Sequence, residues 1–330
     1  MPRRNKNAFK KKGPTNKTFE KQQYRASHAG FHFHNLYQCC QMKWFIKQVL
    51  RIDSKYTSPP LIHGSAFHNG KGAFYLSGSE TKALRVCKAE IKDRQSEYEN
   101  KDDYLLTLER CPVLLAYWIR KFGDKDLKRF NFIAVEEELS LTLPGTDFIV
   151  TVRPDAVVIE KKPPKELYIM ETKTSSFSLG TTELGVYYGD QATIYTWAVE
   201  KAYNCKVSGI IPDIAYWNTK AKDTSNISCV RGNIVNRSER RIAQYLGSLV
   251  QLQNEIAQKI EAYKNGYDPY TLFSRNTYYC NAFFKACEFA DICDNDLTCA
   301  KRLPPGLKRD RSKILPISSH YVNDICCGDM

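Results

Sequence analysis

Two segments rich in Val, Ile, Tyr and Thr, residues 147–160 and 166–174, flank the stretch Lys-Lys-Pro-Pro-Lys at 161–165. β-Branched and aromatic residues favour strands and a proline pair favours a turn, so the pattern predicts a β-hairpin. If the turn is centred on the middle of that stretch, Asp155 and Glu171 are each eight residues from the centre. The hairpin therefore places these two carboxylates opposite each other.

Lys173 extends this patch, because side chains alternate along a strand and residues two apart share a face with each other. Asp155, Glu171 and Lys173 are thus expected to converge. Two carboxylates about 4 Å apart repel by roughly 4 kcal/mol at an effective dielectric near 20. Mg²⁺ offsets such repulsion and prefers oxygen ligands, while a lysine orients or deprotonates an attacking water or stabilises charge on a phosphate. A structural Lys–Glu pair on a solvated sheet face is the alternative.

Further polar residues fall at helical spacing. Gln191 and Tyr195 are four residues apart in a stretch expected to be helical, 183–203, so they share one face. His68 follows Gly64 by four residues at a predicted helix start. His68 is a second candidate metal ligand, with a purely structural histidine as the alternative.

The coarse pattern is helices, then strands, then helices. We expect helices near 35–50, 64–74, 80–99, 102–122, 183–203 and 236–264, and strands near 131–142, 147–160, 166–174, 207–218 and 226–234. This order predicts an α/β fold with a central sheet and a mostly helical cap.

The ordered set of polar residues resembles the PD-(D/E)XK nuclease superfamily over most of the chain, from about Leu36 to Cys293. It is most similar to the RecB-like exonucleases, a branch that includes the AddB nuclease domain, CRISPR-associated iron–sulfur nucleases and phage recombination exonucleases. The residues that carry the resemblance are Gly64, His68, Glu137, Asp155, Glu171, Thr172, Lys173, Gln191 and Tyr195. The implied fold is restriction-endonuclease-like: a mixed β-sheet core flanked by helices, with a helical cap and a C-terminal cysteine-cluster region.

The resemblance also implies roles. The implied ligands of Mg²⁺ or Mn²⁺ are His68, Asp155, Glu171 and the backbone carbonyl of Thr172. Lys173 is expected to activate water, and Gln191 and Tyr195 to position the DNA or the lysine.

An acid on the strand before the hairpin completes the pattern in many relatives. Glu137 occupies that place, in the run Val135-Glu-Glu-Glu138. Glu136 or Glu138 is an equal candidate for the inward position, and a surface charge run is the alternative.

The chain has 12 cysteines, and its basic N-terminus lacks the apolar segment of a secretory signal, which argues against structural disulfides. Cys280, Cys287 and Cys293 cluster in a turn-rich region, a pattern that indicates metal binding and needs a fourth ligand. The resemblance implies that Cys40, which aligns better than Cys39, completes a [4Fe–4S] site. Zinc on the same thiolates and ordinary buried thiols are the alternatives.

The spacing of this cluster departs from that of the relatives. They commonly have two residues between the first pair of C-terminal cysteines, whereas six separate Cys280 from Cys287 and Phe284 occupies the expected position. A shift of four residues is about one helical turn, which leaves Cys280 within reach of the metal.

Charge is unevenly distributed. The chain carries a formal net charge of +13, and residues 1–27, with nine Lys or Arg and one Glu, hold +8 of it. We expect a disordered basic arm at 1–27 that adds salt-sensitive phosphate contacts, or merely solubilises the chain. A nuclease domain is expected over 28–300, closed by the cysteine cluster, and a basic tail over 301–330. No apolar run approaches the ~18 residues that span a bilayer.

The resulting hypothesis is a metal-dependent DNA exonuclease acting in recombination, repair or phage DNA processing. Its expected substrate is DNA with single-stranded or duplex ends, in the cytoplasm, or in that of the host if the chain is phage-encoded. A single-strand annealing protein or a helicase is the expected partner. A non-catalytic DNA-binding or scaffold protein is the alternative, against which the intact Asp, Glu and Lys argue. A zinc-dependent nucleic-acid-binding protein is the third hypothesis.

Overall fold

The computed structural model describes most of the chain as two compact units. The described residues are 30–176, 178–217, 227–284, 286–294 and 303–310. The sheet unit includes Thr57–Leu139 and Val152–Ile242. The cysteine unit includes the described residues of Ala26–Tyr56, Ser140–Thr151 and Ala243–Met330. The predicted arm at 1–27 and the end of the predicted tail, 311–330, lie outside the described residues. The single nuclease domain over 28–300 stays a prediction.

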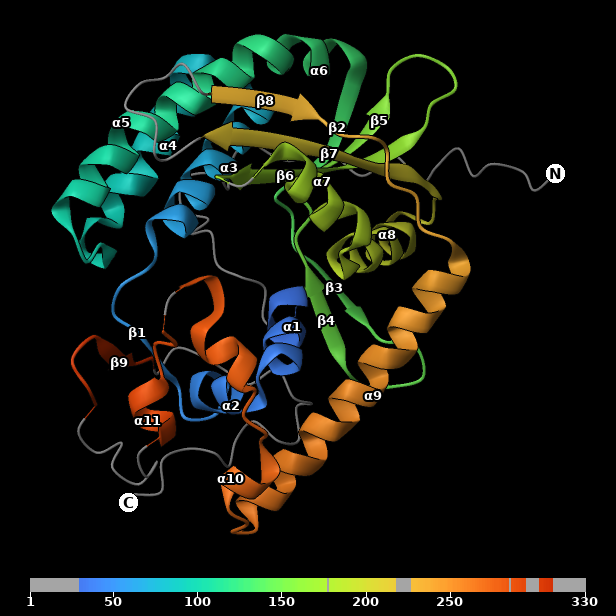
Figure 1. Ribbon diagram of the computed structural model, residues 1–330. Helices are drawn as coiled ribbons and strands as arrows, with labels where there is room; N and C mark the ends of the chain where they lie inside the picture. Colours follow the sequence, from blue (N-terminus) through green and yellow to red (C-terminus); the bar gives the residue numbers. More distant parts are fainter. Residues whose placement is uncertain (1–29, 177, 218–226, 285, 295–302, 311–330) are drawn as a thin grey trace. The chain divides into compact units, whose positions relative to one another are not determined.

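A mixed sheet forms the centre of the sheet unit (Figure 1). Its strands, in spatial order, are β2 (Phe130–Val135), β5 (Ala156–Glu160), β6 (Leu167–Ser175), β7 (Val207–Trp217) and β8 (Ile227–Arg231). The β6–β7 pair is parallel, and the other neighbours are antiparallel. β6 is buried from Leu167 to Thr172 and β7 from Gly209 to Ala215, because both faces of these strands are covered there.

Helices of the sheet unit begin and end at residues that suit those positions. They are α3 (Pro59–Ser77), α4 (Glu80–Asp93), the 3₁₀ turn η1 (Gln95–Glu97), α5 (Lys101–Trp118), the π-helical turn η2 (Ile119–Gly123), α6 (Asp124–Arg129), α7 (Leu179–Tyr188) and α8 (Asp190–Tyr203). Prolines occupy the first turn of α3, and Gly78 ends it in the left-handed conformation. The hydroxyl of Ser79 accepts from the Lys82 N–H at the start of α4.

Alternate residues of β6 face different helices. Met170 accepts a hydrogen bond from Tyr75 of α3, and it belongs to the large core that α3, α4 and α5 form with one face of the sheet. Lys173 instead contacts Gln191 of α8 on the opposite face. The sheet is therefore covered on both sides, and residues 171 and 173 point toward α8.

The cysteine unit is mostly helical. Its elements are α1 (Phe31–Cys39), α2 (Gln41–Gln48), β1 (Ile52–Ser54), the hairpin of β3 (Leu139–Thr142) and β4 (Ile149–Val152), most of α9 (Glu239–Lys264), α10 (Pro269–Leu272), the 3₁₀ turn η4 (Thr277–Phe284), α11 (Ala290–Asp294) and β9 (Leu307–Arg309). Its core is rich in aromatic rings: Phe45 stacks on Phe273 with 4.5 Å between ring centroids, and Trp44 packs against both Tyr37 and Phe33. The two contacts of Trp44 join α1 to α2, and the Phe45–Phe273 contact joins α2 to the segment after α9.

The predicted α/β class, with a mixed sheet flanked by helices, is confirmed. Several expected elements are interrupted. The helix expected at 35–50 is two helices because Cys40 is extended, and the one expected at 183–203 is two because Gly189 is extended. The strand expected at 147–160 stops before Pro154, which cannot donate to a sheet, and resumes after Asp155.

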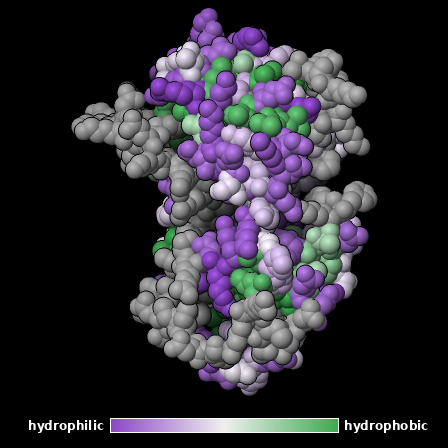
Figure 2. All heavy atoms as spheres, turned by 90° about the vertical axis from the view of Figure 1, so that its left-hand side faces the viewer, coloured by the Kyte–Doolittle hydropathy of each residue, from purple (hydrophilic) through white to green (hydrophobic). Residues whose placement is uncertain are grey.

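One face of the molecule is largely hydrophilic, with apolar side chains gathered in separate patches (Figure 2). Among the described helices, none combines the length and the apolar composition needed to cross a membrane.

Candidate active site and cysteine pocket

The β5–β6 hairpin has the predicted register. Ala156 pairs with Met170 and Val157 with Ile169, which centres the hairpin on Pro163. Asp155 immediately precedes β5, and its carboxylate accepts from the backbone N–H of Thr172 at 2.5 Å. The local sequence thus brings Asp155 to the middle of the Glu171-Thr-Lys173 segment.

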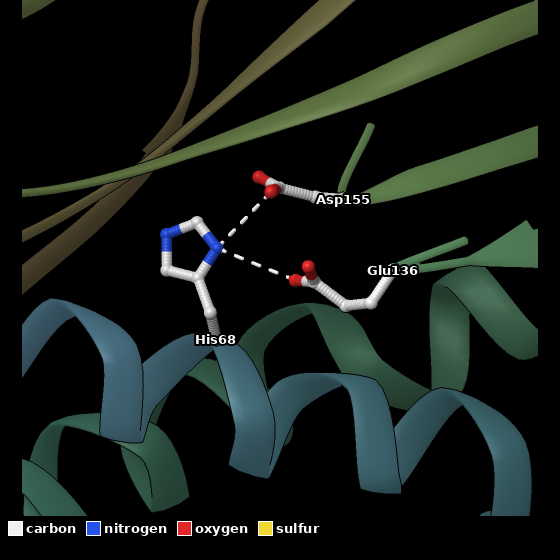
Figure 3. A group of neighbouring side chains, drawn as sticks. All are labelled: His68, Glu136 and Asp155. Atoms are coloured by element: carbon white, nitrogen blue, oxygen red, sulfur yellow. Dashed lines mark hydrogen bonds and ion pairs between the residues drawn. The ribbon is translucent and has the colours of Figure 1, made fainter. Parts of the chain in front are cut away.

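His68 joins Asp155 from the other side, on α3. Its Nδ1 atom lies 3.1 Å from Asp155 Oδ1 and 3.5 Å from Glu136 Oε1 (Figure 3). One ligand atom from each of the three residues lies within 4.8 Å of the others. The side chains are only 9–12% exposed, which makes this a buried group of two carboxylates and an imidazole.

Glu136 is the member of the acidic run that points inward. It follows β2 in the left-handed conformation, with φ of 50°, and its N–H donates to the Asp155 carbonyl. Glu137 and Glu138 are exposed. The sequence left the choice among these three acids open, with Glu137 at the position that the resemblance indicates, because a left-handed residue at the strand end shifts which side chain faces the site.

Glu171 and Lys173 lead from this group toward α8. Lys173 Nζ lies 2.7 Å from Glu171 Oε1 and donates to Gln191 Oε1 at 2.8 Å. Gln191 Nε2 in turn donates to the Tyr195 hydroxyl at 2.9 Å. Gln191 and Tyr195, four residues apart on α8, therefore form a hydrogen-bonded pair that holds the Lys173 amine in place.

Burial and charge oppose each other at these groups. Burial raises the pKa of Glu136 to about 7 and also raises that of Glu171. Burial lowers the pKa of His68, but Asp155 and Glu136 raise it more, to about 10. Burial likewise lowers the pKa of Lys173, and Glu171 reverses this, so the net direction is upward. The neighbouring carboxylates thus stabilise the protonated, cationic forms of His68 and Lys173.

A divalent cation fits this donor set. Glu171 is 3% exposed, and its Oε2 atom has no hydrogen-bond partner among the described residues. An unpartnered buried carboxylate oxygen is costly unless something pairs with it. Carboxylate and imidazole donors suit Mg²⁺ or Mn²⁺. His68, Glu136 and Asp155 form the grouped set, and Glu171 is a further donor beside it.

Two buried residues near this site were missed by sequence reasoning. Lys71 lies three residues after His68 on α3, donates to the Thr172 hydroxyl at 2.5 Å and forms an ion pair with Asp213 of β7. The sequence signals that could have found them were the helical spacing of Lys71 from His68 and the position of Asp213 as the one acid in the apolar run of β7.

The four predicted cysteines line one pocket in the cysteine unit. Cys40, Cys280, Cys287 and Cys293 surround a cavity of about 60 Å³, together with Lys43 and Arg275. All four are free thiols. The backbone N–H of Cys287 donates to the Cys280 carbonyl at 2.8 Å, which holds these two residues together despite their unusual spacing.

Cys40 reaches this pocket because it caps a helix. It is extended between α1 and α2, and its sulfur accepts from the Lys43 N–H at the start of α2. Cys39 does not line the pocket. Burial raises the pKa of the Cys287 and Cys293 thiols, so stable thiolates need positive charge, which a metal supplies.

The fold and the site define an α/β protein with a candidate divalent-metal site built on a strand hairpin. Its family follows from comparison: a model of the PD-(D/E)XK nuclease superfamily matches residues 33–294. The chain belongs to this superfamily, whose members are nucleases that usually use divalent metal ions, and membership implies DNA as the substrate.

Other comparisons add little. The solved structure of SSO0001 is 18% identical over 69% of this chain and 93% of that one, with a TM-score of 0.28, which does not establish a shared fold. No match to a curated protein was found.

Proposed function

We propose that the protein is a Mg²⁺- or Mn²⁺-dependent DNA exonuclease of the RecB-like branch, acting at DNA ends in recombination, repair or phage DNA processing. The observation that carries the proposal is the convergence of His68, Glu136 and Asp155 beside the Glu171–Lys173 pair. Within a nuclease superfamily, that set provides both cation ligands and a positioned amine.

The proposed metal ligands are His68, Glu136, Asp155, Glu171 and the backbone carbonyl of Thr172. A bound divalent cation supplies Lewis acidity and a bound water of lowered pKa. Lys173 has a raised pKa and is an ammonium group at neutral pH. In this form it orients the attacking water and stabilises charge on the phosphate. Gln191, fixed by Tyr195, holds the amine in place.

The second proposed cofactor is a [4Fe–4S] cluster on Cys40, Cys280, Cys287 and Cys293. Four thiols around one pocket match the ligand number of such a cluster. Lys43 and Arg275 also line the pocket and offset negative charge on the thiolates. Zinc on the same thiolates is the competing assignment, which iron and sulfide analysis of anaerobically purified protein decides.

The resemblance to RecB-like exonucleases alone supports the remaining proposals. They are a single-strand annealing protein or a helicase as partner, and action in the cytoplasm, that of the host if the chain is phage-encoded.

The test is cleavage of end-labelled single-stranded and duplex DNA with Mn²⁺ or EDTA. Lys173→Ala and Asp155→Ala are each expected to lower the rate about 100-fold or more, because each removes positioning or charge stabilisation at the reacting phosphate. Lys162→Ala, an exposed lysine in the turn of the same hairpin, is the matched control and should leave the rate unchanged.

Full activity in the Lys173 or Asp155 variant contradicts the mechanism. DNA that is bound but never degraded, with either metal, supports the non-catalytic alternative, a DNA-binding or scaffold protein. Internal nicking in place of loss from the ends contradicts the exonuclease assignment while leaving the nuclease intact.

A further inference from the structure

Helix α7 presents an apolar face to solvent. Leu184, Tyr187 and Tyr188 are three and four residues apart, so they share one side of the helix. Their exposed fractions are 55%, 48% and 66%, and Val186 is the one buried residue of α7. Such a group of exposed apolar side chains, two of them aromatic, indicates a binding surface. We call these three residues the tyrosine face.

The end of α7 that carries the rings is held by arginines. Arg237 donates to the carbonyls of Val186, Tyr187 and Gly189, and Arg241 donates to that of Tyr188 at 2.6 Å. These bonds satisfy carbonyls that a helix end leaves free. The Arg241 side chain remains 35% exposed. Two guanidinium groups therefore lie beside the rings, one of them 3.8 Å from the Asp190 carboxylate, and they provide positive charge for a polyanionic ligand.

The tyrosine face is continuous in sequence with the candidate active site. Tyr188 precedes Gln191 by three residues, and Gln191 accepts from the Lys173 amine. At its other end, α7 is tied to the end of β6, because Thr182 donates to the Ser175 hydroxyl at 2.8 Å. The rings thus lie on a helix that is hydrogen-bonded to β6, the strand of Lys173, and that directly precedes α8, the helix of its partner Gln191.

We propose that the tyrosine face stacks unpaired bases of the DNA end that enters the candidate active site. This inference rests on the proposed function and gives it a substrate class, single-stranded ends. Aromatic rings stack on any base, and the adjacent guanidinium attracts phosphates, which suits an enzyme that reads no sequence. The Tyr187 and Tyr188 rings meet at 84° with centroids 4.9 Å apart, so they offer two separate platforms.

Binding in EDTA, which keeps the DNA intact, tests this on the full-length, cluster-loaded protein. The probes are a labelled single-stranded oligonucleotide and a blunt duplex of the same sequence. The double variant Tyr187→Ala/Tyr188→Ala should raise the Kd for the single strand about fivefold or more and leave the duplex Kd within about twofold. The Phe/Phe double variant keeps the rings and should bind like wild type.

Tyr267→Ala is the matched control, since this tyrosine is 63% exposed and lies elsewhere in the chain. The inference is overturned if the Ala/Ala variant loses affinity equally for both DNAs, if it loses none, or if the Phe/Phe variant loses as much. An unchanged affinity is also the result expected if this face docks a protein. Tyr188→Ala alone repeats the test with a smaller change if the double variant misfolds. Absence of cleavage by wild type in Mn²⁺ defeats the proposed function instead, and leaves ring-dependent binding as a separate result.

Discussion

Lys71 and Asp213, 142 residues apart in the sequence, form an ion pair inside the sheet unit. Their side chains are 3% and 0% exposed. Trp118 donates its indole N–H to the same carboxylate, and Lys71 also donates to the hydroxyl of Thr172, which follows Glu171 on β6. The pair therefore connects α3 and β7 directly behind the strand that carries the candidate catalytic residues.

Breaking this pair should destabilise the sheet unit. Lys71→Met removes the cation and leaves the buried Asp213 with Arg231 and Trp118 as partners. Loss of one of its two cationic partners leaves the buried carboxylate only partly compensated and costs about 3 kcal/mol, which lowers the melting temperature of a unit this size by roughly 6–12 °C. Thermal unfolding monitored by circular dichroism measures this change in melting temperature. Lys88→Met, at an exposed position on α4, is the control. Equal melting of both variants would show that the pair adds no stability.

The acidic run after β2 offers a comparison between neighbours. Glu136→Gln removes a carboxylate that contacts His68, whereas Glu137→Gln changes an exposed side chain. We expect the Glu136 variant to need about 10- to 100-fold more Mn²⁺ for half-maximal cleavage, and the Glu137 variant to match wild type. A titration of Mn²⁺ against cleavage rate decides between them. Equal requirements would remove Glu136 from the proposed ligand set.

The parts of the site that follow from local rules were predictable. The hairpin register follows from strand alternation and a proline turn, so Asp155 and Glu171 were placed from sequence. The shared helix face of Gln191 and Tyr195 follows from their helical spacing, and the hydrogen bond between their side chains is consistent with it. Four thiols at one pocket agree with the ligand set that the resemblance implied.

The parts that depend on tertiary structure were not predictable. The choice of Glu136 among three acids depends on one left-handed residue. Lys71 and Asp213 have the composition of surface residues, and only the pairing of distant segments makes their burial tolerable. The break at Cys40 falls in a stretch whose composition suits a continuous helix, whereas Gly189 was itself a possible break signal.

The fourth cysteine ligand can be tested against its neighbour. Cys40 lines the pocket and Cys39 does not. Cys40→Ala is expected to abolish cluster binding, measured as iron and sulfide per chain and as visible absorbance of anaerobic protein, while Cys39→Ala keeps them. Because metal ligation contributes to folding, the Cys40 variant should also melt at lower temperature. Loss of iron in the Cys39 variant alone would reverse the assignment.

His34 should make the stability of the cysteine unit depend on pH. It is 1% exposed, and burial lowers its pKa from 6.5 to about 4 against an opposing hydrogen bond with Gly30. Between these values the unfolded chain binds more protons than the folded one. Stability is therefore full above about pH 6.5 and falls by about 2 kcal/mol on acidification to about pH 5.

The variant His34→Leu removes this titration and should flatten the fall in melting temperature between about pH 7.5 and pH 5. It also leaves the buried Gln253 amide without its contact to the ring, so it lowers stability at every pH. The informative quantity is thus the slope against pH, not the melting temperature itself. His32→Leu changes an exposed histidine of the same helix and should keep the wild-type slope. If His34→Leu keeps it too, other groups carry the acid sensitivity.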